Sequence, residues 1–217
     1  SYSVTGVQTC ALPIFEFPAG PAGESSPVKA SLISEVTQIA PGDSFTVALR
    51  LEHAPHWHTY YLNPGQVGNP PQVKWTLPDG VSAGKLRFPV PMIGDFAGAK
   101  FYGYEGEAWF LTTISTTSVL PETLTITAKA SWLACKEQCM PGDAELSLVI
   151  RSGTQTTIDP DLVTAFATAR AGMPLEQAPW TLTVSEDKAL VAINLIPGFG
   201  AVDAPEDVHF FSSDRQD

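Results

Sequence analysis

The strongest constraint on the fold is a stretch in the middle of the chain where apolar and polar side chains alternate. Every second residue of this stretch is apolar: Leu124, Ile126, Ala128, Ala130 and Trp132. The residues between them include Thr125, Thr127 and Lys129. Because successive side chains of a β-strand point to opposite faces of its sheet, this pattern predicts a strand with one buried face.

The same alternation recurs elsewhere, in residues 44–51 and 146–150, and residues 108–118 combine threonines with aromatic residues that suit a pleated surface. Turn signals separate these stretches: Pro41-Gly42, Pro64-Gly65, Pro78-Asp79-Gly80 and Pro141-Gly142. Several short strands with such punctuation indicate an all-β sandwich.

One short helix is expected after these strands. Asp159 can cap it, Pro160 suits its first position, and Gly172 can end it. Four apolar residues then share one face: Leu162, Val163, Phe166 and Ala169.

Alternation resumes in residues 181–196 and 208–211, but about 40 residues are too few for a second sandwich. We therefore expect the chain to be organised in four parts. They are a non-native or disordered lead-in at 1–27, the main β domain at 28–152, a helical linker at 153–178, and a partial second β domain at 179–217.

Charge restricts the class of partner. The chain has 12 basic and 23 acidic residues, which gives a formal net charge of −11. Nucleic acids and anionic membrane surfaces are both bound through basic patches, so we expect neither as a partner. The sequence also contains no apolar stretch of about 18 residues that could span a bilayer.

Three cysteines are present, and Cys10 lies in the lead-in, which leaves Cys135 and Cys139 within the segment SWLACKEQCMPGD. We expect a strand to end near Leu133, so the segment must then bend to bring the sulfur atoms together. A disulfide that closes so small a ring restrains the unfolded chain little. The spacing therefore favours a redox-active pair over a structural disulfide or a metal site.

Two aromatic clusters accompany the cysteines. The segment HWHTYYLNPGQVGN at 56–69 carries Trp57, Tyr60 and Tyr61, and GAKFYGYEGE at 98–107 carries three aromatic residues among three glycines. These side chains either pack as an ordinary core or shield the cysteines, and a glycine-rich loop at 98–107 could move.

Histidines offer an alternative role for the cysteines. His53 lies close in sequence to His56 and His58, and imidazole and thiolate groups together suit copper(I) or zinc. The alternative function is thus a copper- or zinc-binding module, with its ligands drawn from His56, His58, Cys135 and Cys139.

Three segments together resemble the N-terminal periplasmic domain of the DsbD family of thiol:disulfide interchange proteins. The branch that fits best is the suppressor of copper sensitivity protein B type. The segments are HWHTYYLNPGQVGNPPQVKWTLPDG, KFYGYEGEAWF and SWLACKEQCMPGDAELSL, and they extend from about His56 to Leu148. The resemblance implies an immunoglobulin-like sandwich with an inserted active-site region.

The resemblance also implies roles for individual residues. Cys139 matches the cysteine that forms a mixed disulfide with partner proteins, and Cys135 matches the resolving cysteine. Phe101 matches the aromatic residue of a cap loop, with Tyr102 and Gly103 beside it. Tyr60 matches another aromatic residue that lies near the cysteines in the family.

The implied activity is that of a periplasmic protein-disulfide reductase. Reducing equivalents would arrive from a membrane-embedded domain through a thioredoxin-like domain and pass to periplasmic thiol proteins, with no cofactor. The parent protein would be anchored in the membrane beyond this segment. Ala99 and Asn63 depart from the pattern of the best-known member, so no acid–base carboxylate is carried over to this chain.

Overall fold

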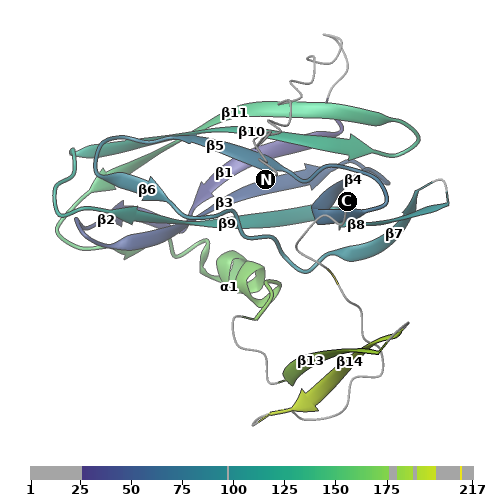
Figure 1. The fold of residues 1–217 in the computed structure, drawn as a ribbon. Helices are drawn as coiled ribbons and strands as arrows, with labels where there is room; N and C mark the ends of the chain where they lie inside the picture. Colours follow the sequence, from purple (N-terminus) through teal and green to yellow (C-terminus); the bar gives the residue numbers. More distant parts are fainter. Residues whose placement is uncertain (1–25, 97, 176–179, 188–189, 199–210, 212–217) are drawn as a thin grey trace, which may run out of the picture.

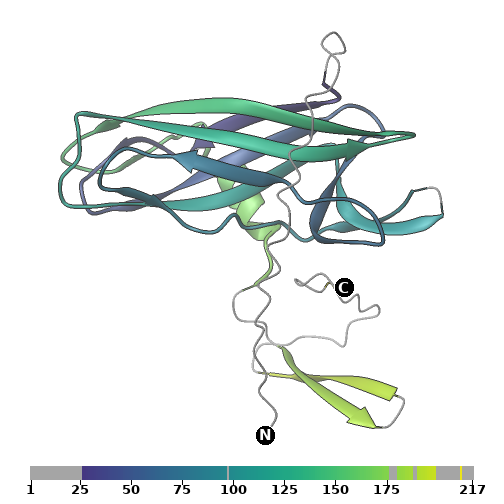
Figure 2. The same ribbon diagram turned by 45° about the horizontal axis from the view of Figure 1, so that its top comes forward.

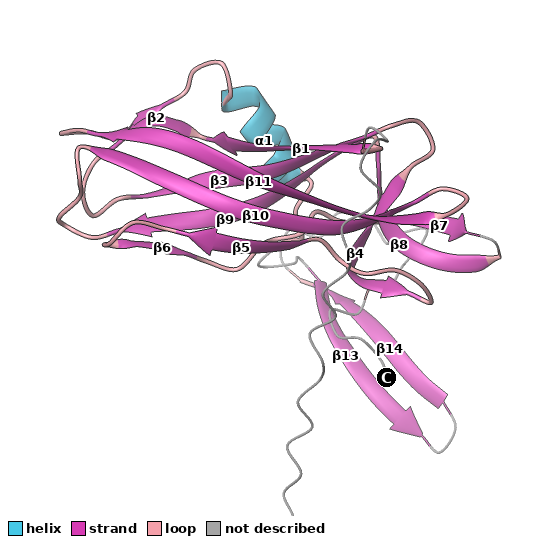
Figure 3. Cartoon of the chain, turned by 90° about the horizontal axis from the view of Figure 1, so that it is seen from above, coloured by secondary structure: helices cyan, strands magenta, loops and turns pink. Residues whose placement is uncertain are grey.

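We describe the fold from a computed structural model. It describes residues 26–96, 98–175, 180–187, 190–198 and 211. Strands dominate this part of the chain, with one short helix (Figure 3). The first strands are β1 (Val28–Ser34), β2 (Val36–Ile39), β3 (Ser44–His53), β4 (His58–Gly65), β5 (Gln72–Thr76), β6 (Val81–Ala83) and β7 (Met92–Phe96). They are followed by β8 (Ala99–Glu105), β9 (Glu107–Thr116), β10 (Thr123–Cys135), β11 (Cys139–Ser152) and β12 (Thr157–Ile158).

Two sheets form the body of the molecule (Figure 1). One has the strand order β1-β3-β9-β6, and the other has the order β12-β2-β11-β10-β4-β8-β7, with β5 also paired to β10. The antiparallel pairing of β10 with β11 extends from Thr123 opposite Arg151 to Cys135 opposite Cys139. The predicted all-β sandwich with one short helix is therefore confirmed.

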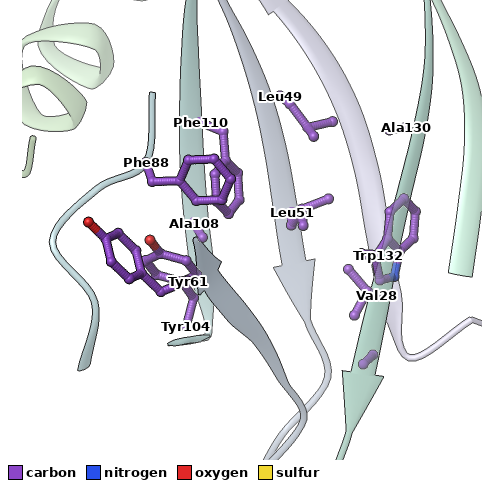
Figure 4. Close-up of a cluster of buried hydrophobic side chains, with 11 residues drawn as sticks. Val28, Leu49, Leu51, Tyr61, Phe88, Tyr104, Ala108, Phe110, Ala130 and Trp132 are labelled. Atoms are coloured by element: carbon purple, nitrogen blue, oxygen red, sulfur yellow. The ribbon is translucent and has the colours of Figure 1, made fainter. Parts of the chain in front are cut away.

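The core lies between the two sheets. Figure 4 shows side chains from both layers, among them Leu49 and Leu51 of β3, Phe110 of β9 and Trp132 of β10. The sequence predicted that the alternating apolar residues of β10 would be buried. Leu124, Ile126 and Ala130 are indeed fully buried. One face of β10 thus contributes to the core along most of its length.

Two predictions about the cysteine segment were wrong. The strand does not end near Leu133, because β10 continues to Cys135. Pro141-Gly142 does not form the turn either, since these residues lie within β11, opposite Leu133 and Trp132. The turn is made by residues 136–138, which connect the two strands as a hairpin.

Pro64-Gly65 was also predicted as a turn and instead ends β4. The pairing of β4 with β8 is irregular between Tyr60 and Gly65, where the register shifts. This irregularity allows Pro64 and Gly65, which usually favour turns, to lie within a strand. The turns predicted at Pro41-Gly42 and at Asp79-Gly80 are confirmed.

The helix, α1 (Val163–Ala171), begins later than predicted. Asp159 does not cap it, and its carboxylate instead accepts a hydrogen bond of 3.1 Å from the backbone N–H of Asp161 in the preceding turn. Pro160 also lies in this turn and not at the first helical position. The predicted end at Gly172 is confirmed.

The buried face of α1 is centred on Phe166, which is 1% exposed. Its ring meets that of Trp109 on β9 edge-on at a centroid distance of 5.5 Å, and Ala48, Leu111 and Met173 complete the cluster. Val163, which was expected on this face, is 52% exposed. The helix therefore docks on the β1-β3-β9-β6 sheet chiefly through one aromatic side chain.

The C-terminal segment contributes a further hairpin of β13 (Trp180–Asp187) and β14 (Leu190–Pro197), which form a sheet of their own (Figure 2). Alternation in residues 181–196 predicted these strands. Of residues 208–211, only Phe211 lies within the described part of the chain. Within the described residues, no helix has the length and apolar character needed to cross a membrane.

Replacing Phe166 with alanine tests how the helix is held. The substitution leaves a cavity against Trp109, so we expect the free energy of unfolding to fall by about 3–5 kcal/mol, measured by urea denaturation. Val163→Ala is the matched control in the same helix, because this side chain is mostly exposed and its truncation should change stability little. Equal losses in the two variants would contradict the docking described here.

Candidate redox site

Cys135 and Cys139 face each other at the turn end of a hairpin. Cys135 is the last residue of β10, Cys139 is the first residue of β11, and the two are paired in register. They are joined by a disulfide with a Cα–Cα distance of 4.1 Å. Side chains of directly opposed residues lie on the same face of a sheet, so the hairpin itself brings the two sulfur atoms together.

The two cysteines differ sharply in exposure. Cys135 is fully buried, whereas Cys139 is exposed at the tip of the hairpin beside Lys136 and Glu137, which are also exposed. A protein approaching this tip therefore meets Cys139 first. The disulfide thus has one accessible sulfur and one enclosed sulfur.

Burial of Cys135 is unexpected from its position on β10. The odd-numbered residues of this strand point away from the sandwich core, and Lys129 and Ser131 on that face are exposed. Nearer the site, the same face carries Leu133 and then Cys135. Strands β4, β8 and β7 extend the sheet at this end, and side chains of β4 and β8 cover the outer face.

The cover is a small aromatic cluster. Tyr60 on β4 is fully buried and Phe101 on β8 is 2% exposed, and both pack with Cys135, with Val67 and Leu133 at the edge. The rings of Tyr60 and Phe101 meet edge-on at a centroid distance of 5.7 Å. Two predicted site residues, Tyr60 and Phe101, are therefore brought together around the predicted cysteine Cys135.

Phe101 lies on a strand and not in the loop that the glycines suggested. Strands β7 and β8 form a hairpin, in which Gly94 is opposite Phe101. A Cβ atom added at Gly94 would lie 2.2 Å from the Phe101 ring, and one added at Gly103 would lie 2.1 Å from the Thr59 carbonyl oxygen. Gly94 therefore allows close packing of β7 on β8, and Gly103 allows close packing of β8 on β4. We call the hairpin of β7 and β8 (residues 92–105) the cap hairpin.

Tyr102 points to the opposite face of the cap hairpin from Phe101. Its ring meets that of Phe211 edge-on at a centroid distance of 5.0 Å, and Tyr61 also contacts Phe211 at 6.2 Å. Tyr102 packs against the main core and not against the cysteines. Of the predicted cap residues, Phe101 thus contacts the site, and Tyr102 supports the strand from behind.

His58 belongs to the same cluster, although the sequence suggested it only as a metal ligand. Its imidazole stacks on the Phe101 ring at a centroid distance of 4.0 Å and an angle of 15° between planes. Its Nε2 lies 3.2 Å from the Tyr60 hydroxyl. Burial, assisted by the nearby His53, lowers the pKa of His58 to about 4, so the ring is neutral at pH 7.

The other histidines lie apart from the sulfur atoms. His56 is exposed with a backbone φ of 68°, and His53 bonds through its ring to the Gly106 carbonyl and to the Thr59 hydroxyl, each at 2.8 Å. Across the described ranges, no group of three or more His, Cys, Asp or Glu side chains is arranged to hold a metal ion. Only His58, of the proposed histidine ligands, is adjacent to the cysteine pair.

Comparison with protein families decides the relationship. Residues 29–151 match the model of the N-terminal domain of the thiol:disulfide interchange protein DsbD. This chain belongs to that family. The match covers every strand of both sheets except β12, together with the hairpin that carries the disulfide, so the DsbD resemblance seen in the sequence is confirmed.

One solved structure supports the fold, and a second is also found. The N-terminal periplasmic domain of ScsB from Proteus mirabilis aligns with a TM-score of 0.58 at 19% identity, over 84% of this chain and 72% of that one. The N-terminal domain of DsbD from Neisseria meningitidis in the reduced form aligns with a TM-score of 0.32 at 17% identity, over 59% and 88%. A comparison with curated protein sequences gives no match.

The predicted immunoglobulin-like fold is thereby confirmed for this DsbD-family domain. The family match and the cysteine pair together identify a thiol–disulfide interchange module. The domain boundaries and the roles of the individual site residues stay predictions.

Acid should destabilise the oxidised protein through His58. Its pKa is lower in the folded than in the unfolded state, so its contribution to stability is fully present above about pH 6.5 and is lost as the pH falls towards 4. Between pH 7 and pH 4.5 we expect the free energy of unfolding to fall by about 2 kcal/mol more in the parent than in His58→Gln. Urea denaturation at the two pH values measures this difference.

His56→Gln is the control for this experiment, because the exposed His56 gains nothing from burial. It should keep the acid sensitivity of the parent. If His58→Gln were as acid-sensitive as His56→Gln, the burial of a neutral imidazole in the cluster would be refuted.

Proposed function

We propose that this domain is a protein-disulfide reductase module that exchanges disulfides with partner proteins through Cys139 and closes its own disulfide through Cys135. The observation that carries the proposal is the unequal exposure of the two paired cysteines. Thiol–disulfide exchange needs one sulfur that a partner can reach and a second sulfur within reach of the first. The hairpin register supplies that second sulfur.

The reaction conserves electrons and protons. In the reduced module, the Cys139 thiolate attacks one sulfur of the partner disulfide, which forms a mixed disulfide and releases the other partner sulfur as a thiolate. Cys135 then loses its proton and attacks the Cys139 sulfur. This step forms the Cys135–Cys139 disulfide and releases the second partner sulfur, so the partner is reduced by two electrons.

Regeneration runs in the opposite direction. A thioredoxin-like donor attacks the exposed Cys139 sulfur of the disulfide, Cys135 leaves as a thiolate, and a second donor thiol then frees Cys139. We infer that the donor and the acceptors are periplasmic proteins, which fits the family match and the periplasmic domain among the structural neighbours. A membrane-anchored parent protein that supplies the donor belongs to the same proposal.

Phe101 has a protective role in this scheme. Its ring packs on Cys135 together with Tyr60, so small thiols and oxidants reach Cys139 more easily than Cys135. An enclosed resolving thiol is protected from overoxidation and from unspecific disulfides, because these reactions follow accessibility. The cap hairpin would move only when a partner protein displaces it.

Single cysteine variants test the order of attack. In a Cys10→Ser background, Cys135→Ser should accumulate a stable mixed disulfide between Cys139 and an oxidised thioredoxin-like protein, because the resolving thiol is missing. Cys139→Ser should accumulate none, because Cys135 is enclosed. Non-reducing electrophoresis and mass analysis of the adduct measure both outcomes, and trapping through Cys135 alone would reverse the assignment.

The reduction potential separates exchange from a structural disulfide. Equilibration in graded thiol buffers with metal chelated should give a value for the Cys135–Cys139 pair between about −270 and −120 mV, the range of known exchange proteins. A potential below about −300 mV is typical of structural disulfides and would contradict the proposed function. Thiols that alkylate only after metal removal would support the metal-binding alternative.

Truncation of the cap residue tests the protective role. In a Cys10→Ser, Cys139→Ser background, Phe101→Ala should raise the rate at which iodoacetamide alkylates Cys135 severalfold, because the covering ring is lost. Tyr102→Ala is the matched control, since its side chain is on the opposite face of the same strand. Equal rates in Phe101→Ala and the parent would rule out shielding by Phe101.

A further inference from the structure

The enclosure of Cys135 creates a chemical requirement for the second exchange step. Only the thiolate attacks a disulfide, yet an apolar surrounding disfavours the charged thiolate. Cys135 is fully buried among Tyr60, Phe101, Leu133 and Val67, none of which carries a charge. A group that takes the proton from Cys135 must therefore lie inside the cluster or open onto it.

His58 is the titratable group in the right place. Within the described residues, the buried polar or charged side chains are those of His58, Thr59 and Thr112. Thr112 is on β9 of the other sheet, and the Thr59 hydroxyl bonds to His53. Of the three, only the imidazole has a ring nitrogen that can take up a proton and carry it as a cation.

The sheet places His58 against Cys135. The two residues are paired in the antiparallel register of β4 and β10, so their side chains leave the same face of the sheet with Cβ atoms about 4.5–5.5 Å apart. Phe101 contacts both, since it stacks on the imidazole and packs with the cysteine. One aromatic ring thus encloses the thiol and the histidine together.

The orientation of the imidazole is also fixed. Stacking on Phe101 holds the plane of the ring, and the Tyr60 hydroxyl lies 3.2 Å from Nε2. Burial raises the pKa of Tyr60 to about 12, so this hydroxyl stays neutral at working pH and serves as a hydrogen-bonding partner. Tyr60 itself packs on Cys135, which makes the three side chains one connected unit.

We propose that His58 receives the proton of the Cys135 thiol when Cys135 attacks the mixed disulfide at Cys139. The Cys135 S–H bond breaks, its proton passes to a ring nitrogen of His58, and the Cys135 sulfur bonds to the Cys139 sulfur. The partner sulfur leaves with the electron pair of the broken S–S bond. The departing thiolate then takes up a proton, and the imidazolium returns its own to solvent. The proposal deepens the proposed function and rests on it.

Charges around His58 are consistent with this role. His53 opposes a positive charge on His58, the exposed Glu105 is paired with His58 in the β4–β8 register, and the Tyr60 hydroxyl is neutral. In the disulfide form no anion faces the imidazole from β10. When Cys135 ionises, its negative charge favours the imidazolium, so the two groups titrate as a coupled pair.

Reaction with an aromatic disulfide separates the two exchange steps. In a Cys10→Ser background, the reduced protein is mixed with 5,5′-dithiobis(2-nitrobenzoate) in a stopped-flow instrument. The first coloured thiolate reports attack by Cys139, and the second reports closure by Cys135. We expect His58→Gln to slow the second phase at least about tenfold at pH 7 and to leave the first phase within about twofold of the parent.

The pH profile distinguishes proton transfer from simple packing. The defect of His58→Gln should shrink as the pH rises, because hydroxide then removes the Cys135 proton directly. His53→Gln is the matched control, since this second histidine bonds to Thr59 and Gly106. Its replacement removes a group that opposes a positive charge on His58, so the second phase should not become slower. His58→Phe is a second variant in case His58→Gln folds poorly. It keeps a packed ring but has no proton acceptor, so we expect the same slow second phase.

The outcomes separate this proposal from the one on which it rests. A normal first phase with an unchanged second phase in both His58 variants would overturn the role of His58 and leave the exchange function intact. A defect that is equal at all pH values would also overturn it, since that result indicates altered packing. If no first phase is seen in the parent, the exchange function itself fails.

Discussion

The pairing of β10 with β11 is the interaction on which the rest of this domain depends. The inward-facing residues of β10 supply one layer of the sandwich core, and the last register pair of the same ladder is the cysteine pair. The position of the site is therefore set by a continuous run of backbone hydrogen bonds that begins deep in the domain. Any change that shifted this register by one residue would move Cys135 to the other face of the sheet and disrupt the core as well.

The two faces of the sheet are used for different purposes. The inner face is an ordinary sandwich core, whereas the outer face is polar along most of β10 and becomes apolar at Leu133 and Cys135. There the inserted strands β4 and β8 build a second, much smaller cluster from Tyr60, Phe101 and His58. Its importance lies in making one sulfur of the pair accessible and the other enclosed.

Much of the fold could be predicted because it follows local rules. Alternation identified the long strands, and the spacing of Cys135 and Cys139 indicated a pair that only a bend could join.

The type of bend was missed because Pro141-Gly142 is a common turn signal, whereas the actual turn, at residues 136–138, contains neither glycine nor proline. The helix start was misplaced for a similar reason, since Asp159 closes a turn of its own. His58 was missed as a neighbour of Phe101 because that contact joins two strands about 40 residues apart. The change from polar to apolar on the outer face of β10 was the one signal that could have indicated a covered site.

The register of the cysteine hairpin also determines what happens when the disulfide opens. Twelve further residue pairs hold β10 against β11, from Thr123 opposite Arg151 to Ala134 opposite Met140. The strands thus stay together without the sulfur–sulfur bond, and the two thiols of the reduced domain remain opposite each other. Most of the entropy of bringing them together has already been lost in folding, so closure behaves as a reaction at very high effective concentration. Under the proposed function, a mixed disulfide on Cys139 would therefore be short-lived, and the geometry of the sheet would itself favour release of the partner.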